Sequence, residues 1–122
     1  MLQQYHDVLQ ELPPQITVPF ENHAGISSAN NLPILLPVRT NPIRLMENMK
    51  AQRIQTSIHN APIHRFSAFQ NIKSSILAVT EDIAQREVSL PLYPAMGDTY
   101  VVLIAKAIHD ALSEPVHNKT NR

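Results

Sequence analysis

The sequence contains no cysteine and no tryptophan, and it has only two glycines against ten prolines. Without cysteine, the chain has no disulfide framework, no thiolate nucleophile and no cysteine-based zinc or iron–sulfur site. The two glycines, Gly25 and Gly97, lie far apart in the sequence. This separation excludes the glycine-rich loops that hold phosphate in Walker and dinucleotide-binding motifs.

An excess of charge and long hydrophobic runs are also missing. Ten Lys and Arg balance ten Asp and Glu, so the formal net charge is +0 at pH 7. The overall attraction to phosphate on which most nucleic-acid-binding proteins depend is therefore absent. The longest apolar stretches, 32–38 and 101–105, are too short to span a membrane, and residues 1–12 include charged side chains where a signal peptide would be apolar. We expect a soluble, cytoplasmic protein with no nucleic-acid partner and no membrane partner.

The length and the composition are those of one domain. The chain has 122 residues, of which 43% are hydrophobic, which is enough for one core and too little for two. We expect residues 1–114 to form a single small domain that starts with a leading helix over 1–12. We expect residues 115–122 to be a polar tail.

Hydrophobic spacing and turn residues predict an alternation of helices and short strands. The predicted helices cover 1–12, 42–53, a segment that begins at Thr80, and 97–112. The predicted strands cover 32–38, 54–59 and 89–93, with a further short strand near 16–20. This order is typical of an α+β domain in which a small antiparallel or mixed sheet is covered on one face by helices.

Local signals support three of these elements. Asn41 can cap the helix that follows it, and Pro42 then occupies the first helical position, where its missing N–H costs nothing. Pro33 and Pro37 each lack a ladder donor, so their strand is expected at an edge of the sheet. Thr80 is expected to cap its own helix. The expected buried residues of that helix are Ile83, Ala84 and Val88.

Two histidines are the first candidates for a functional site. His59 ends a predicted strand and His64 follows it across a proline turn, so both can face one cleft. A zinc site would need a third ligand, which His6, His23 or a carboxylate could supply, but no spacing in the chain has the form of a zinc motif. Two polar histidines that form hydrogen bonds within a turn are an equally good interpretation.

Other chemistry is less well supported. Ser89 could act as a nucleophile with His59 as its base, but a nucleophile elbow needs glycine around the serine. Three arginines could hold an anionic ligand, although a solvated helix face is the default interpretation. They are Arg39, Arg44 and Arg53. The acidic residues between positions 81 and 87 are better explained by solvated positions near a helix N-terminus than by paired acid–base catalysis. These residues are Glu81, Asp82 and Glu87.

Two segments, taken together, resemble a known family. They are Ile54-Gln-Thr-Ser-Ile-His-Asn-Ala-Pro-Ile-His64 and Ser89-Leu-Pro-Leu-Tyr-Pro-Ala-Met96, with a Thr-Glu-x-x-Ala helix between them. Their order, their spacing and the amphipathic helix that closes the chain are similar to the C-terminal part of the DegT/DnrJ/StrS family of pyridoxal-phosphate-dependent sugar aminotransferases. The resemblance is best over residues 32–112, and the leading helix also fits.

The resemblance implies an α+β fold like the C-terminal domain of a fold-type I aminotransferase, packed on a large domain that binds pyridoxal phosphate. His59, Asn60 and His64 would then contact the sugar nucleotide near a dimer interface, so the implied partners are that substrate, the large domain and a second copy of the chain. The lysines of this chain lie in contexts unlike that of a Schiff-base lysine. They are Lys50, Lys73, Lys106 and Lys119. We therefore expect the chain alone to have no catalytic residue, to bind no cofactor or metal, and to be inactive as an aminotransferase.

Two positions depart from the family pattern. Arg53 stands where the family usually has glycine before the strand, and Asn60 stands where it usually has tyrosine after the first histidine. These departures leave open a second hypothesis, in which the chain is a free-standing binding or interaction module that has kept the fold without the chemistry. A domain that normally packs on a neighbour should expose an apolar face, so the first hypothesis predicts self-association or co-purification with a large-domain protein.

Overall fold

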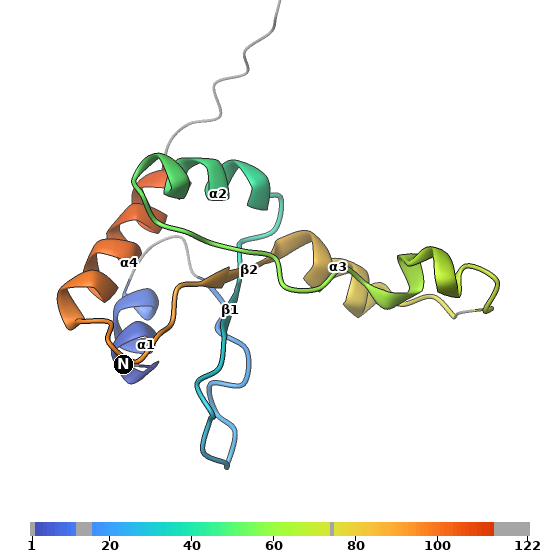
Figure 1. Ribbon diagram of the computed structural model, residues 1–122, viewed down its shortest axis with the longest axis horizontal. Coiled ribbons are helices and arrows are strands. Elements are labelled where there is room, and N and C mark those ends of the chain that lie inside the picture. The colour runs from blue at the N-terminus through green and yellow to red at the C-terminus, as the bar shows by residue number, and fades with distance from the viewer. Residues whose placement is uncertain (1, 12–15, 74, 114–122) are drawn as a thin grey trace, which may run out of the picture.

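The computed structural model describes residues 2–11, 16–73 and 75–113. In chain order the main elements are helix α1 (Leu2–Gln10), strand β1 (Leu32–Leu35), helix α2 (Pro42–Ala51), helix α3 (Ala78–Arg86), strand β2 (Glu87–Leu90) and helix α4 (Asp98–Ser113) (Figure 1). Two 3₁₀ turns, η1 (Ile63–Arg65) and η2 (Ser67–Phe69), lie between α2 and α3. The predicted polar tail at 115–122 and the predicted helix end at 12 lie outside the described residues.

The sheet is small and antiparallel. Strands β1 and β2 pair with Leu32 opposite Leu90 and Leu35 opposite Glu87. One isolated bridge extends each outer edge, from Thr17 to Leu35 and from Ser57 to Ser89. The predicted α+β class is therefore confirmed, and the predicted strand near 16–20 is reduced to the bridge at Thr17.

The hydrogen-bonding pattern of β1 explains why this strand can contain Pro33. The Leu35 N–H donates to the Thr17 carbonyl at 2.8 Å, so residue 35 has its backbone polar groups on the side away from β2. Pro33 lies two residues earlier and faces the same outer side, because backbone groups alternate along a strand. Its missing N–H therefore removes no hydrogen bond between β1 and β2.

The predicted strand over 54–59 is wrong, because only Ser57 pairs with the sheet. Ser57 and Ser89 exchange hydrogen bonds of 3.1 and 2.7 Å, and the ladder stops there on both sides. Toward one side the next partner would be Pro91, which has no N–H to donate. Toward the other side the next partner would be Glu87, whose N–H already bonds to the carbonyl of Ile83 at the end of α3. The chain therefore leaves the sheet after Ser57.

The predicted helices that follow Asn41 and Gly97 are confirmed as α2 and α4. The Asn41 side chain accepts a hydrogen bond of 2.9 Å from the Ile43 N–H, and Pro42 is the first residue of α2. Helix α4 follows Gly97, as its periodicity predicts. Its buried residues are Val101, Ile104, Ala105, Ala107 and Ile108.

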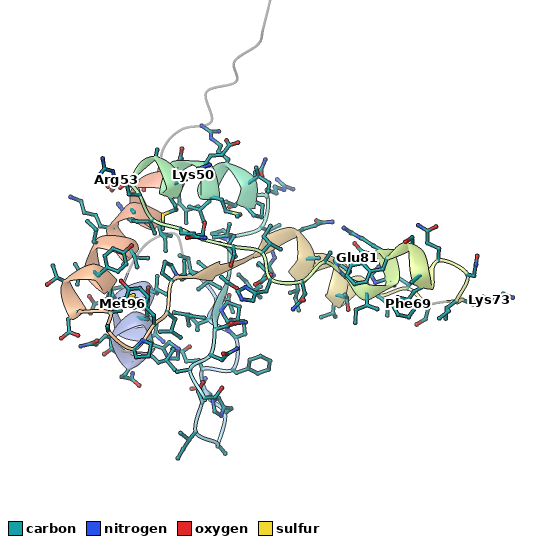
Figure 2. The ribbon with its side chains drawn as sticks, viewed as in Figure 1. Lys50, Arg53, Phe69, Lys73, Glu81 and Met96 are labelled. Atoms are coloured by element: carbon teal, nitrogen blue, oxygen red, sulfur yellow. The ribbon has the colours of Figure 1, made fainter. Side chains whose placement is uncertain are left out.

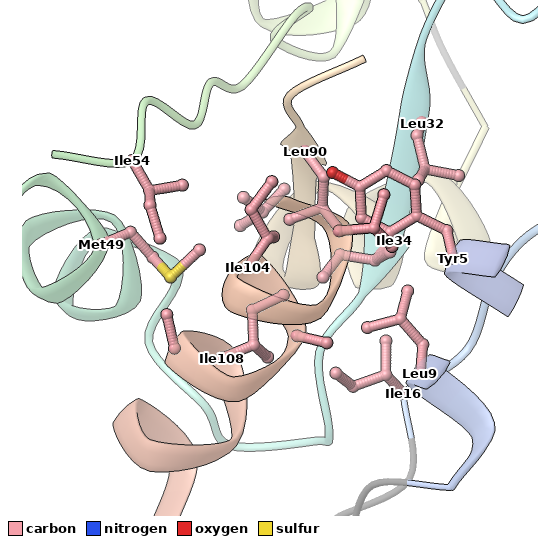
Figure 3. Packing of buried hydrophobic residues seen from close by; sticks show 14 of the residues in the cluster. Tyr5, Leu9, Ile16, Leu32, Ile34, Met49, Ile54, Leu90, Ile104 and Ile108 are labelled. Atoms are coloured by element: carbon pink, nitrogen blue, oxygen red, sulfur yellow. The ribbon is translucent and has the colours of Figure 1, made fainter. Parts of the chain in front are cut away.

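One hydrophobic core joins α1, α2, α4 and the sheet (Figure 3). Tyr5 and Leu9 of α1, Met49 of α2 and Ile104 of α4 all have no more than a trace of exposed surface. The Tyr5 hydroxyl donates to the Pro91 carbonyl at 2.7 Å. Burial, with smaller contributions from the neighbouring tyrosines, raises the pKa of Tyr5 far above its usual value, so its phenol stays a proton donor. Helix α1 is thereby attached to the segment that follows β2.

Helix α3 differs from its prediction. It begins at Ala78, before Thr80, and no side chain caps it, so the predicted Thr80 cap is wrong. No residue of α3 is buried, Ile83 is 40% exposed, and only Val88, which belongs to β2, reaches the core. The reason is visible in Figure 1, where the segment before α3 and most of α3 itself project away from the core. We call this projection, residues 60–73 and 75–84, the arm.

Candidate functional site

The arm is held together by one carboxylate. Glu81, on α3, lies 2.5 Å from His64 Nε2 through its Oε1 atom. The Arg65 guanidinium bonds to both oxygens of the same carboxylate, with Nε to Oε1 at 3.3 Å. Figure 2 places Glu81 midway along the arm, between Phe69 and the core. Charge-assisted bonds of this kind fix geometry well, so Glu81 connects the outgoing and the returning limb of the arm.

The arm contains an apolar hollow beside this cluster. A cavity of about 400 Å³ is lined by Ile63, His64, Phe69, Ile72, Leu77 and Thr80. Several apolar side chains of the arm also face solvent, including Ile63 (64% exposed), Ile72 (63%) and Ile76 (96%). So many exposed apolar side chains on one projecting segment are typical of a surface that another protein surface covers.

The three predicted substrate residues are not brought into one described cavity. His64 lines the hollow of the arm. His59 is exposed, and its Nδ1 atom lies 3.2 Å from the Ser57 hydroxyl. Asn60 is also exposed, at the base of the arm. None of the four described cavities is lined by both His59 and His64, and the chain leaves the sheet after Ser57 instead of continuing as a strand.

The other predicted polar residues have structural partners. Ser89 is 3% exposed and donates to Glu87 at 3.0 Å, so it is not aligned with His59 as a nucleophile. Asp82 bonds to Arg86 at 2.7 Å, and this hydrogen bond lowers the pKa of the Asp82 carboxyl. Arg86 also donates to the Leu36 carbonyl at 2.9 Å and so joins α3 to the end of β1.

No metal centre emerges from the described ranges 2–11, 16–73 and 75–113, where no group of three or more His, Asp or Glu side chains could hold an ion. His6 lies 3.9 Å from Glu21, and His23 accepts a hydrogen bond from the Gly25 N–H at 3.0 Å. None of the helices in these ranges combines the length and apolar composition that crossing a bilayer requires.

A second cavity lies between α2 and the segment that follows it. It has a volume of about 550 Å³ and is lined by Ile43, Met46, Glu47, Lys50, Arg53, Ile54, Gln55 and Thr56. Of the three arginines considered from the sequence, only Arg53 lines it. Thr56 was not singled out from the sequence, yet its hydroxyl is buried there without a hydrogen-bond partner among the described residues. Only the tertiary structure reveals such an orphaned group.

The described lysines do not fit a pyridoxal phosphate site. A Schiff-base lysine is activated by removal from water or by a neighbouring cation in a closed pocket. Lys73 lies near the tip of the arm (Figure 2), and Lys50 and Lys106 are exposed on helices. Lys119 lies outside the described residues. No step of transamination can therefore be assigned to these side chains.

Two solved structures that share this fold are aminotransferases. A putative PLP-dependent aminotransferase from Bacillus cereus ATCC 10987 superposes with a TM-score of 0.76 at 28% identity, over 88% of this chain and 29% of that chain. The Helicobacter pylori aminotransferase PseC, involved in the biosynthesis of pseudoaminic acid, superposes with a TM-score of 0.79 at 22% identity, over 89% of this chain and 30% of its own. The α1–α4 core and the arm thus have the fold of one part of an aminotransferase.

The sequence comparison gives the family itself. The chain belongs to the DegT/DnrJ/EryC1/StrS aminotransferase family, whose profile matches residues 1–109. An uncharacterised protein of Methanocaldococcus jannaschii is 29% identical over 117 residues, which is 90% of this chain and 30% of that protein. The chain therefore spans less than a third of the length of the relatives that it matches, and the resemblance seen in the sequence is confirmed.

Proposed function

We propose that the chain acts as the small domain of a pyridoxal-phosphate-dependent sugar-nucleotide aminotransferase and helps to form the substrate pocket and the dimer interface. Residues 1–114 constitute this domain, and it works in the cytoplasm. The cofactor supplies the electron sink for amino transfer and is bound by the large domain of the enzyme. The chain alone binds no cofactor and transfers no amino group.

The arm is the observation that carries this proposal. It projects from a core that is already complete, so its exposed isoleucines and phenylalanines are not needed to fold the domain. The Glu81 cluster nevertheless gives the arm a defined shape. An ordered projection with an apolar surface is suited to contact with the large domain or with a second copy of the chain.

The polar residues of the arm and its base would face the substrate in that assembly. His64 is the best placed of them, because Glu81 fixes the orientation of its ring through Nε2. His59 and Asn60 lie where the arm leaves the sheet and can donate or accept hydrogen bonds at its base. Their proposed role is to bind and orient the sugar nucleotide, with no part in bond breaking.

The association of the chain tests the role of the arm. Sedimentation velocity of the full chain should show an oligomer whose population grows with concentration. The double variant Phe69→Ser/Ile72→Ser should associate more weakly, because it removes two apolar side chains from the arm. The matched control Ile26→Ser changes an isoleucine that is fully exposed on another loop, and it should associate like the wild type. A wild-type chain that stays monomeric, or an arm variant that associates normally, would contradict the proposal.

A second candidate is a free-standing interaction module with the same fold. Arg53 and Asn60, which stand where the family usually has glycine and tyrosine, are the residues that favour it. Such a module would use the same arm to bind another protein, so the sedimentation experiment does not separate the two functions. The size of the native gene product does, since only an aminotransferase domain must be joined to a large domain.

A further inference from the structure

The cavity beside α2 combines an apolar floor with a cationic rim. Ile43, Met46 and Ile54 form the apolar part of its lining, and Lys50 and Arg53 contribute cations where α2 ends (Figure 2). A volume of about 550 Å³ is in the range of pockets that hold small organic molecules. Helix α2 lies on the core, away from the tip of the arm (Figure 1), and none of the residues that line the cavity belongs to the arm.

Arg53 occupies a backbone position that favours glycine. The Arg53 N–H donates to the Lys50 carbonyl and the Ile54 N–H donates to the Met49 carbonyl, both at 2.9 Å. These two bonds form a Schellman motif, in which the residue after the helix cap adopts a left-handed conformation. Arg53 accordingly has a φ of 62°. The helix end needs only backbone bonds from this residue, so the guanidinium is not required for capping.

The charges of the rim are not used within the fold. Among the ion pairs of the described residues, none involves Lys50 or Arg53. Glu47 also lines the cavity, but it forms no described ion pair with either cation, and the rim keeps a net positive charge. Thr56 lines the same cavity, and its hydroxyl oxygen is buried without a hydrogen-bond partner among the described residues. A buried hydroxyl without a partner is unfavourable and can be satisfied by a ligand acceptor.

We propose that this cavity is a binding site for a small organic anion with an apolar body. The carboxylate, sulfonate or phosphate of the ligand lies between Lys50 and Arg53, and its apolar body lies against Ile43, Met46 and Ile54. The site is separate from the sugar-nucleotide contacts proposed above, because its lining includes none of His59, Asn60 and His64.

A titration of the full chain with 1-naphthoate tests the proposal. The ¹⁵N-labelled chain should show saturable shifts of the amide signals of residues 46–56. The neutral analogue 1-naphthalenemethanol should bind at least tenfold more weakly, because it lacks the charge that Lys50 and Arg53 recognise. Inorganic phosphate should also bind more weakly, because it lacks the apolar body.

Three variants locate the site. Arg53→Gly keeps the left-handed turn and removes the guanidinium, so it should weaken 1-naphthoate binding about tenfold without unfolding the chain. Lys50→Gln should have an effect of the same size. Lys106→Gln is the matched control, since Lys106 borders an apolar hollow of about 410 Å³ on α4, and it should bind 1-naphthoate like the wild type. Equal binding by Arg53→Gly, equal affinity for the neutral analogue, or amide shifts that map to α4 or the arm would each overturn the proposal.

Discussion

Replacement of Arg53 by glycine should stabilise the protein. A residue with a side chain in the left-handed conformation costs about 1–2 kcal/mol, which glycine does not. Glycine loses more backbone entropy on folding, which offsets about 0.5–1 kcal/mol of that gain. The φ of 62° at Arg53 and the two Schellman bonds around it would both be kept. We therefore expect Arg53→Gly to raise the free energy of unfolding by about 1 kcal/mol.

Urea denaturation followed by circular dichroism measures this change, and a thermal melt should show a midpoint that is about 4 °C higher. Arg53→Ala is the matched control, because it removes the same charge but keeps the Cβ atom that makes the turn unfavourable. It should not be more stable than the wild type. If Arg53→Gly is no more stable than Arg53→Ala, the left-handed backbone conformation of residue 53 does not lower the stability of the fold.

Three further changes test other contacts. Tyr5→Phe should lower the free energy of unfolding by about 1–2 kcal/mol in urea denaturation, because the Pro91 carbonyl loses its buried donor; an unchanged midpoint would show that this bond contributes nothing. Glu81→Gln should speed amide hydrogen exchange across residues 63–69 while exchange in α4 stays the same, because the arm loses the carboxylate that joins its limbs. Exchange across residues 63–69 that is as slow in the variant as in the wild type would contradict this role. Asp82→Asn should make the stability less dependent on acid pH. The pKa of Asp82 is lower in the folded state than its unfolded value of 3.8, so the ionised carboxylate stabilises the fold at pH values above 3.8. This contribution is lost as the pH falls through the folded pKa. Acid titration curves that are identical for the variant and the wild type would show that the Asp82–Arg86 pair does not couple to folding.

Local signals were enough to predict the helices of the core. Asn41 and Pro42 fix the start of α2, because a cap and its proline act within a single turn. The periodicity after Gly97 predicts α4, because the same face is apolar over the whole helix. The α+β class follows from the order of these elements.

The errors come from competition for hydrogen bonds between distant segments. The alternation of residues 54–59 is typical of a strand, but Pro91 cannot donate to it and the Glu87 N–H is already taken by α3. Thr80 has the chemistry of a cap, yet the helix begins before it, at Ala78. Neither outcome can be inferred from the few residues around the element concerned.

The candidate site shows the same limit. The sequence identifies both histidines as candidates, but it favours a solvated role near a helix N-terminus for Glu81, which in the structure is the partner of His64. The orphaned Thr56 hydroxyl has no sequence signal at all, because it depends on what packs around it. The family resemblance predicted the fold correctly, whereas the substrate contacts of His59, Asn60 and His64 stay a prediction.

The central claim is that this chain works as one domain of a longer aminotransferase, and the size of the native gene product tests it most directly. An immunoblot of the source cells with an antibody against this chain should show a band a few times larger than 13.7 kDa. The protein purified with that antibody should carry pyridoxal phosphate absorbance. A single band at 13.7 kDa would contradict the claim and would indicate a free-standing module.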